Sequence, residues 1–194
     1  MIDWKDYKIF SDNLSNLKEI SKDDSDKENI DYMTDSLKEA VNFDAVKTEY
    51  TNGLNLSEEN ATSVDGIFEM SNHLIFIEFK NGNMKNQKRS VKDKIRDSLL
   101  IFCDITGKQV KDTREWLEFI LVYNVEKNPM PHQVTKEETE VQESVSRTNI
   151  AKYFSSKAKK EFIRFDLEKF KDLYFYDVHT YSKEEFAEYL EKDM

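Results

Sequence analysis

Two apolar stretches, SVDGIFEM at Ser63–Met70 and LIFIEFK at Leu74–Lys80, are separated by the dipeptide Ser71-Asn72. Both stretches are rich in β-branched and aromatic residues, which favour strands, and the dipeptide between them is typical of a tight turn. We therefore predict a β-hairpin. A two-residue turn at Ser71-Asn72 sets its register and places Asp65 directly opposite Glu78.

This register gathers charged side chains on one face of the hairpin. Side chains alternate faces along a strand, so Glu78 and Lys80 share a face that is otherwise apolar. Directly opposed Cβ atoms lie ~4.5–5.5 Å apart, and two carboxylates at that distance repel one another unless a cation or a proton lies between them. We expect Asp65 and Glu78 to hold Mg²⁺ or Mn²⁺, which take oxygen ligands, with Lys80 pointing at a bound water. The alternative is a structural ion triad across the two strands.

Such a group suits the hydrolysis of phosphodiester bonds, because a metal lowers the pKa of water and neutralises charge on the phosphate while a lysine orients the nucleophile. At these residues the sequence resembles the PD-(D/E)xK nuclease superfamily: Asp65 precedes Glu78-Phe79-Lys80 at a suitable distance, although Val64 stands where many members have proline. The resemblance implies a restriction endonuclease-like core of a helix, a three-strand meander, a helix and a further strand.

The resemblance also implies a role for each residue of the motif. Asp65 and Glu78 would bind the metal together with the carbonyl of Phe79, and Lys80 would be the catalytic base or would position the water. Many members add an acid from a preceding helix, for which Glu39 is the first candidate and Asp44 the second. Glu39 lies away from the apolar stripe of the predicted helix, whereas Asp44 lies on its apolar side near the end.

A basic segment follows the hairpin. Between Lys80 and Arg96 the chain has seven basic residues and one acid, Asp93, although the protein as a whole carries a net charge of −10. A local basic cluster beside paired carboxylates would hold a nucleic-acid backbone near the metal. The predicted nucleic-acid-binding residues are Lys85, Lys88, Arg89, Lys92 and Arg96, and the alternative is a solvated helix face.

The remaining pattern predicts a single α/β domain over residues 1–194, in which helices flank a central mixed sheet. Its core spans about residues 25–125, with an N-terminal helical elaboration and a C-terminal one over about residues 131–194. We predict helices within residues 1–22, from a Ser25/Glu28 capping box to Phe43–Val46, at Lys88–Ile105, at about Lys136–Lys160 and from Ser182 onward, and further strands at Trp116–Val125, Phe162–Leu167 and Tyr174–Tyr181.

Composition excludes several classes of protein. One cysteine, Cys103, excludes an internal disulfide framework and a cysteine-rich zinc site. No apolar run approaches the ~20 residues that cross a bilayer, and the first residues lack the basic and apolar regions of a signal peptide, so we expect a cytoplasmic protein without a membrane partner. The net charge argues against binding nucleic acid by overall charge alone.

Three functions therefore remain open. The first is a Mg²⁺- or Mn²⁺-dependent nuclease, with DNA as the expected substrate and a homodimer as one arrangement for cutting two strands. The second is a silent nuclease-fold binding module, such as an immunity protein or inhibitor, whose acidic surface binds a basic protein. The third is a subunit of a defence or mobile-element complex in which a partner supplies the DNA-binding surface.

Overall fold

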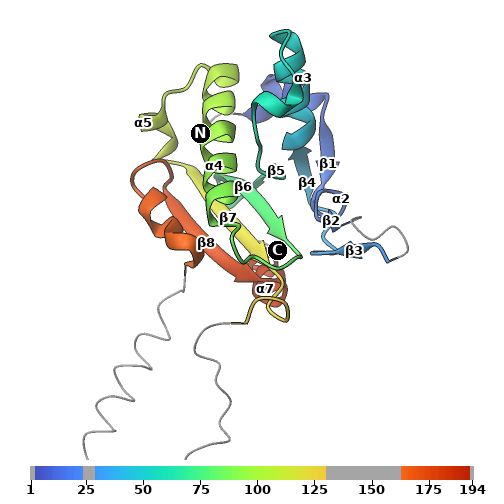
Figure 1. Ribbon diagram of the computed structural model, residues 1–194. Coiled ribbons are helices and arrows are strands. Elements are labelled where there is room, and N and C mark those ends of the chain that lie inside the picture. Colours follow the sequence, from blue (N-terminus) through green and yellow to red (C-terminus); the bar gives the residue numbers. More distant parts are fainter. Residues whose placement is uncertain (1–2, 24–28, 130–162, 193–194) are drawn as a thin grey trace, which may run out of the picture.

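The computed structural model describes residues 3–23, 29–129 and 163–192. Its centre is a mixed six-stranded sheet of order β1-β4-β5-β6-β7-β8 (Figure 1). Neighbouring strands from β1 to β6 are antiparallel, whereas β6, β7 and β8 are parallel. The strands are β1 (Leu14–Asn16), β4 (Glu39–Asn42), β5 (Gly66–Met70), β6 (His73–Lys80), β7 (Leu117–Tyr123) and β8 (Asp177–Ser182), with a smaller sheet of β2 (Lys22–Asp23) and β3 (Asp31–Tyr32). The predicted α/β class, a mixed sheet flanked by helices, is confirmed.

The predicted hairpin is confirmed together with its register. β5 pairs with β6 from Met70 opposite His73 to Gly66 opposite Ile77. Ser71 and Asn72 form the turn with φ values of 49° and 62°. A two-residue turn with positive φ at both central positions matches the right-handed twist of the flanking strands, which explains why the pairing starts directly at the turn.

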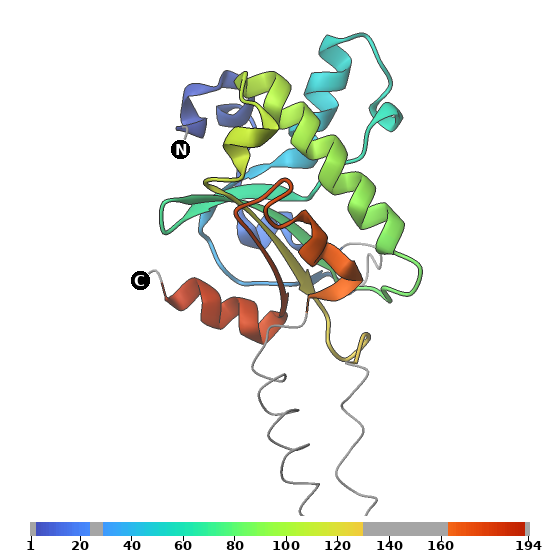
Figure 2. The same ribbon diagram turned by 90° about the vertical axis from the view of Figure 1, so that its left-hand side faces the viewer.

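The alternation along β6 separates two apolar layers. Leu74 and Phe76 pack on the face covered by α4 (Lys88–Thr106), while Ile75 and Ile77 pack on the face covered by α7 (Lys183–Glu191). Figure 2 shows these two helices on opposite sides of the sheet. All seven residues of β7 are buried, as predicted for a strand covered on both faces.

Two predicted helices are confirmed with their boundary signals. α4 matches the prediction for Lys88–Ile105, and it ends at Gly107, whose φ of 66° is the left-handed conformation usual after a helix C-terminus. α7 begins after Ser182, whose hydroxyl accepts a hydrogen bond from the backbone N–H of Glu185 at 3.1 Å, while the Glu185 carboxylate accepts one from the Ser182 N–H at 2.7 Å. This reciprocal pair is the predicted capping box.

The predicted helix from Ser25 to Phe43–Val46 is wrong. Within that range β3 and β4 are strands, and its predicted capping box falls on residues outside those described. Ala40 and Val41 are adjacent and both fully buried, because β4 lies between β1 and β5 and has a packed layer on each face. Leu37, an apolar residue within the range of the predicted helix, is 75% exposed.

The N-terminal segments are shorter than predicted. Instead of one helix, residues 3–22 form the 3-10 turn η1 (Trp4–Asp6), α1 (Lys8–Ser11), β1 and α2 (Leu17–Ile20). The helix α3 (Phe43–Gly53) begins where the predicted one should end, and the Asn42 side chain caps it by accepting a hydrogen bond from the Ala45 N–H at 3.0 Å. A 3-10 turn, η2 (Glu58–Asn60), lies in the loop that leads to β5.

The C-terminal predictions are confirmed in part. The segment predicted as a strand at Phe162–Leu167 is instead, over its described part, within the 3-10 helix η3 (Arg164–Phe170), where Phe165 and Asp166 have positive φ. β8 begins at Asp177, three residues later than predicted. A four-residue helix, α5 (Val110–Thr113), precedes β7. The helix predicted at about Lys136–Lys160 lies outside the described residues, and among those described no helix is long and apolar enough to cross a membrane.

Candidate active site

The start of β5 and the end of β6 bring the predicted site residues together. Asp65 directly precedes β5, and its N–H donates to the Ile77 carbonyl at 3.0 Å. Ile77 is also the register partner of Gly66, with which the pairing of the two strands ends, so the predicted pair of Asp65 with Glu78 is not part of the ladder. The Asp65 carboxylate also accepts a hydrogen bond from the Phe79 N–H at 2.6 Å, so that it is fixed against the end of β6.

Tight packing holds the segment before β5 in place. The Val64 N–H donates to the hydroxyl of Ser98 on α4 at 2.8 Å, and the Thr62 N–H donates to Asp97 of the same helix at 2.9 Å. On the other side, a Cβ added at Gly66 would lie 3.0 Å from both Ile20 and the Val41 carbonyl. Glycine at position 66, next to Asp65, therefore allows the backbone of β4 to approach closely.

Glu78 lies in the middle of the group and is fully buried. Its Oε1 is 2.7 Å from the Lys80 ammonium and 2.8 Å from the Lys94 ammonium, and Lys94 also donates to Oε2 at 3.1 Å. Lys94, which comes from α4, is 3.1 Å from Asp65 Oδ1 as well. Two carboxylates and two ammonium groups therefore form one mixed cluster with a formal charge of zero, in which Lys94 bridges the acids.

The cluster changes the acidity of its members. Burial and the charge of Glu78 raise the pKa of Asp65 to about 7, against the opposing effect of Lys94. Burial acts to lower the pKa of Lys94, but the charges of Glu78 and Asp65 outweigh it and the pKa is raised. The closely spaced acids thus favour a cation between them, which in this structure is the ammonium of Lys94.

A pocket of about 410 Å³ opens beside the cluster. Asp65, Phe79 and Lys80 contribute to its lining, whereas Glu78 and Lys94 do not. Asp44 in the first turn of α3 lines the same pocket, and its carboxylate accepts a hydrogen bond from Ser63. The opposite part of the lining comes from β2 and from the residues that follow β6: Lys22, Asp23, Asn81, Gly82, Asn83 and Gln87.

The donor set fits a hard divalent cation. No described donor is oriented for a hydrogen bond to Glu78 Oε1, so this buried oxygen has ionic neighbours only. The Lys80 carbonyl accepts a hydrogen bond from the Asn124 N–H, after β7, and the Ile77 carbonyl accepts one from the Asp65 N–H, before β5. Because successive carbonyls along a strand point to opposite sides, the Phe79 carbonyl points to the same side as that of Ile77, toward Asp65. Two carboxylates and one carbonyl leave room for the waters that Mg²⁺ usually keeps. The described residues hold no group of three or more His, Cys, Asp or Glu side chains that could bind a metal.

Glu39, the first candidate for an additional acid, does not reach this site. It is the first residue of β4, its side chain is half exposed, and it pairs with Lys5 at 2.6 Å. The prediction was wrong because it assumed a helix here, whereas the residue lies in a strand and its side chain points toward η1, which contains Lys5. Asp44, the second candidate, is the acid that the structure places in the pocket.

The predicted nucleic-acid-binding residues lie along the outer side of α4 and just before it. Lys85 and Arg89 are exposed, and Lys88 pairs with Asp166 of η3. Lys92 and Arg96 lie over the ring of Phe170, with the charged groups 5.7 and 5.6 Å from its centre. A basic surface is therefore present on the same helix that supplies Lys94, although Arg89 and Arg96 also pair with Asp93.

The sequence-based reasoning did not identify Lys94 as a site residue. It counted Lys94 only as one charge of the basic segment. The available signal was its position three residues after Val91 and four before Ser98, both buried, which places Lys94 on the stripe of α4 that faces the sheet.

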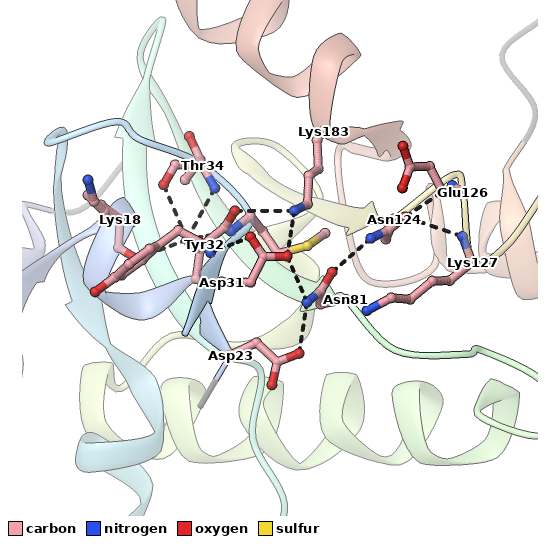
Figure 3. Close-up of polar contacts among 12 residues, drawn as sticks. Lys18, Asp23, Asp31, Tyr32, Thr34, Asn81, Asn124, Glu126, Lys127 and Lys183 are labelled. Atoms are coloured by element: carbon pink, nitrogen blue, oxygen red, sulfur yellow. Dashed lines mark hydrogen bonds and ion pairs between the residues drawn. The ribbon is translucent and has the colours of Figure 1, made fainter. Parts of the chain in front are cut away.

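A polar network beside the pocket was also not predicted. The Asn81 amide donates to Asp23 at 2.9 Å and to Asp31 at 3.1 Å, and it accepts a hydrogen bond from the Asn124 amide at 2.9 Å (Figure 3). Lys183 of α7 donates to Asp31 at 3.1 Å. The network ties β2 and β3 to the end of β6, which keeps this small sheet beside the pocket that Lys22 and Asp23 line.

Comparison of the chain with protein-family models, with curated proteins and with solved structures finds no match.

Proposed function

We propose that this protein is a metal-dependent nuclease of the PD-(D/E)xK type that hydrolyses phosphodiester bonds, with DNA as the substrate. The observation that carries the proposal is the arrangement of Asp65, Glu78 and Lys80. These residues come from two paired strands, are held within one charged cluster, and adjoin a pocket. An acid pair with a lysine beside it at a pocket is the set that metal-assisted phosphodiester hydrolysis requires.

The topology gives further support. From β4 to β7 the chain forms three neighbouring antiparallel strands, with α3 between the first two, then α4, and then a strand parallel to the last of the three. The strands and α4 follow the order that the resemblance to the nuclease superfamily implies, whereas the helix expected before the first strand instead follows it, as α3. Asp65, directly before β5, lines the pocket, and Glu78 near the end of β6 is joined to it through Lys94.

Different residues would bind the metal, orient the attacking water and hold the nucleic acid. Asp65, Glu78 and the carbonyl of Phe79 would bind Mg²⁺ or Mn²⁺, and the bound ion would lower the pKa of water and neutralise charge on the phosphate. Lys80 is mostly buried, with 20% of its side chain exposed, and it lines the pocket. Its ammonium group can therefore orient the attacking water and stabilise the negative charge that develops on the phosphate. The basic side of α4 would hold the nucleic-acid backbone.

A silent binding module that uses the acidic surface to hold a basic protein partner is the second candidate. It is favoured by the net charge of −10 and by the neutralisation of both carboxylates within the chain. In such a module the four charged residues would serve only as a structural ion cluster, whether the protein acts alone or as a subunit of a larger complex.

A cleavage assay separates the two candidates. Purified protein is incubated with Mg²⁺ or Mn²⁺ and with supercoiled plasmid, linear duplex, single-stranded DNA or RNA. The nuclease proposal predicts metal-dependent cleavage that is lost in Lys80→Ala and retained in Lys111→Ala, an exposed lysine of α5 outside the pocket lining. Absence of cleavage on every substrate would favour the binding module, and equal cleavage by Lys80→Ala would show that the activity does not come from this site.

A further inference from the structure

The ammonium of Lys94 occupies the space between the two carboxylates of the site. It lies 3.1 Å from Asp65 Oδ1, 2.8 Å from Glu78 Oε1 and 3.1 Å from Glu78 Oε2. It reaches this point from α4, whereas the carboxylates come from the sheet, and 20% of its side chain is exposed. Lys94 is therefore the cation that joins Asp65 to Glu78.

A divalent ion held by the same acids would need the same oxygens. Mg²⁺ binds carboxylate oxygens directly, and an ion in contact with both Asp65 and Glu78 would take the position between the acids that the Lys94 ammonium holds. Repulsion between the two cations adds to this exclusion in a poorly solvated site. The pocket reaches Asp65 but not Glu78, and Lys94 contacts both acids, so an ion that binds both acids has to replace the Lys94 ammonium between them.

Lys80 has a different position. It contacts Glu78 Oε1 alone, it comes from the same strand as Glu78, and it lines the pocket. An ion bridging Asp65 and Glu78 need not displace it. The two lysines of the cluster are thus distinguishable by geometry: one bridges the acids and the other lies beside one of them.

We infer that Lys94 is a resident cation that holds the Asp65–Glu78 pair together in the metal-free protein and is exchanged for the divalent ion when the ion binds. This inference rests on the proposed function, because it concerns the same acids. It makes metal binding competitive with an internal ion pair, so the protein binds its metal more weakly than the two carboxylates alone would, and the site remains ordered when no metal is bound.

Calorimetric titration of the full chain with MnCl₂ tests the exchange. Lys94→Met removes the competing cation with little change in side-chain volume, and we expect it to bind Mn²⁺ about tenfold more tightly than the wild type, or better. Lys111→Met removes the same charge outside the pocket and should leave the affinity within about twofold. Lys80→Met should give a smaller gain than Lys94→Met, because the ion need not expel Lys80.

Thermal unfolding gives a second readout that does not depend on activity. Without metal, Lys94→Met should unfold at a lower temperature than the wild type, because its two neighbouring carboxylates lack the cation between them, and Mn²⁺ should raise its unfolding temperature by more than it does for the wild type. If Lys94→Met does not fold, the wild type alone suffices: in ¹⁵N spectra of lysine ammonium groups, the signal of Lys94 should shift on addition of Mg²⁺ more than the signal of Lys80.

The outcomes separate this inference from the proposed function. Equal Mn²⁺ affinity in the wild type and Lys94→Met, or an unmoved Lys94 signal with Mg²⁺ bound, would overturn the exchange and leave the metal site standing. Absence of Mn²⁺ binding in both proteins, together with an unchanged unfolding temperature, would contradict the proposed function itself.

Discussion

Glu78 is the residue on which both lysines of the site converge. It is fully buried, so its charge has lost its hydration, and the ammonium groups of Lys80 and Lys94 compensate for this loss. Because Glu78 is buried, its contribution to the stability of the fold depends on both ammonium groups being present. Removal of Glu78 leaves the Lys80 ammonium without its carboxylate and Lys94 with Asp65 alone.

We therefore predict that Glu78→Gln lowers the free energy of unfolding by about 3–5 kcal/mol, the loss usual when one partner of a buried ion pair is removed. Urea denaturation of the metal-free protein measures the change. Glu69→Gln is the matched control, because Glu69 is an exposed residue of β5 in the same hairpin, and it should change the free energy by less than about 0.5 kcal/mol. Equal effects of the two substitutions would show that the Glu78 cluster contributes nothing to stability.

The raised pKa of Asp65 predicts a pH dependence. Because the folded-state pKa is about 7 and the unfolded-state pKa is near the ordinary value of 3.8, the folded protein holds a proton that the unfolded chain releases between these values. The stability contributed by this group is complete below about pH 4 and is lost as the pH rises to about 7. Asp65→Asn should remove this part of the pH profile of unfolding measured without metal, and an unchanged profile would contradict the raised pKa.

At this scale the sequence predicted three members of the cluster but not the fourth. Asp65, Glu78 and Lys80 could be assigned because strand alternation and a two-residue turn relate them through local geometry alone. Lys94 could not, because its contact with the acids depends on how far and at what angle α4 lies over the sheet. The same holds for Asn81, whose partners Asp23 and Asp31 are far away in the sequence.

At the scale of the elements, β5 is held between close neighbours. Gly66→Ala should lower the free energy of unfolding by about 1–3 kcal/mol, because the new methyl group would lie 3.0 Å from the Val41 carbonyl, a backbone atom that cannot move aside freely. Gly53→Ala at the end of α3 is the control, since nothing lies within 4 Å of the added atom there, and it should be neutral or stabilising. Chemical denaturation of both variants measures the difference; an equal effect would mean that β4 does not pack closely against β5.

Elements with strong local signals were predicted correctly, and those defined by their neighbours were not. The hairpin has a tight turn, and α4 has an apolar stripe. β7 is a continuous apolar run, and α7 begins with a capping box. β4 has only four residues, Glu39–Asn42, and its conformation depends on pairing with β1 and β5. Its apolar residues also fitted a helical stripe, which produced the wrong helix and the wrong role for Glu39.

At the scale of the whole molecule, the charge is distributed unevenly. The chain is acidic overall, yet the outer side of α4 presents basic side chains next to the pocket and to η3. An acidic protein that binds DNA must do so through such a local surface, because its overall field repels phosphate.

Arg89 tests this surface most cleanly, because 94% of its side chain is exposed and its loss should not affect folding. We predict that Arg89→Ala weakens DNA binding and lowers the slope of log affinity against log salt concentration by about 1, the effect of one lost phosphate contact. Fluorescence anisotropy at several salt concentrations measures both quantities, with Lys111→Ala as the control. Identical slopes for wild type and Arg89→Ala would exclude this part of α4 from the DNA-binding surface.

Anomalous X-ray diffraction from crystals soaked in MnCl₂ shows whether Asp65 and Glu78 together bind a catalytic metal. We predict one strong Mn²⁺ peak in contact with both carboxylates, adjoining the pocket, and no such peak in crystals of Glu78→Gln. A structure with Mn²⁺ present in the soak, no peak at these acids and Lys94 still joining them would contradict the claim and identify the four charges as a structural ion cluster.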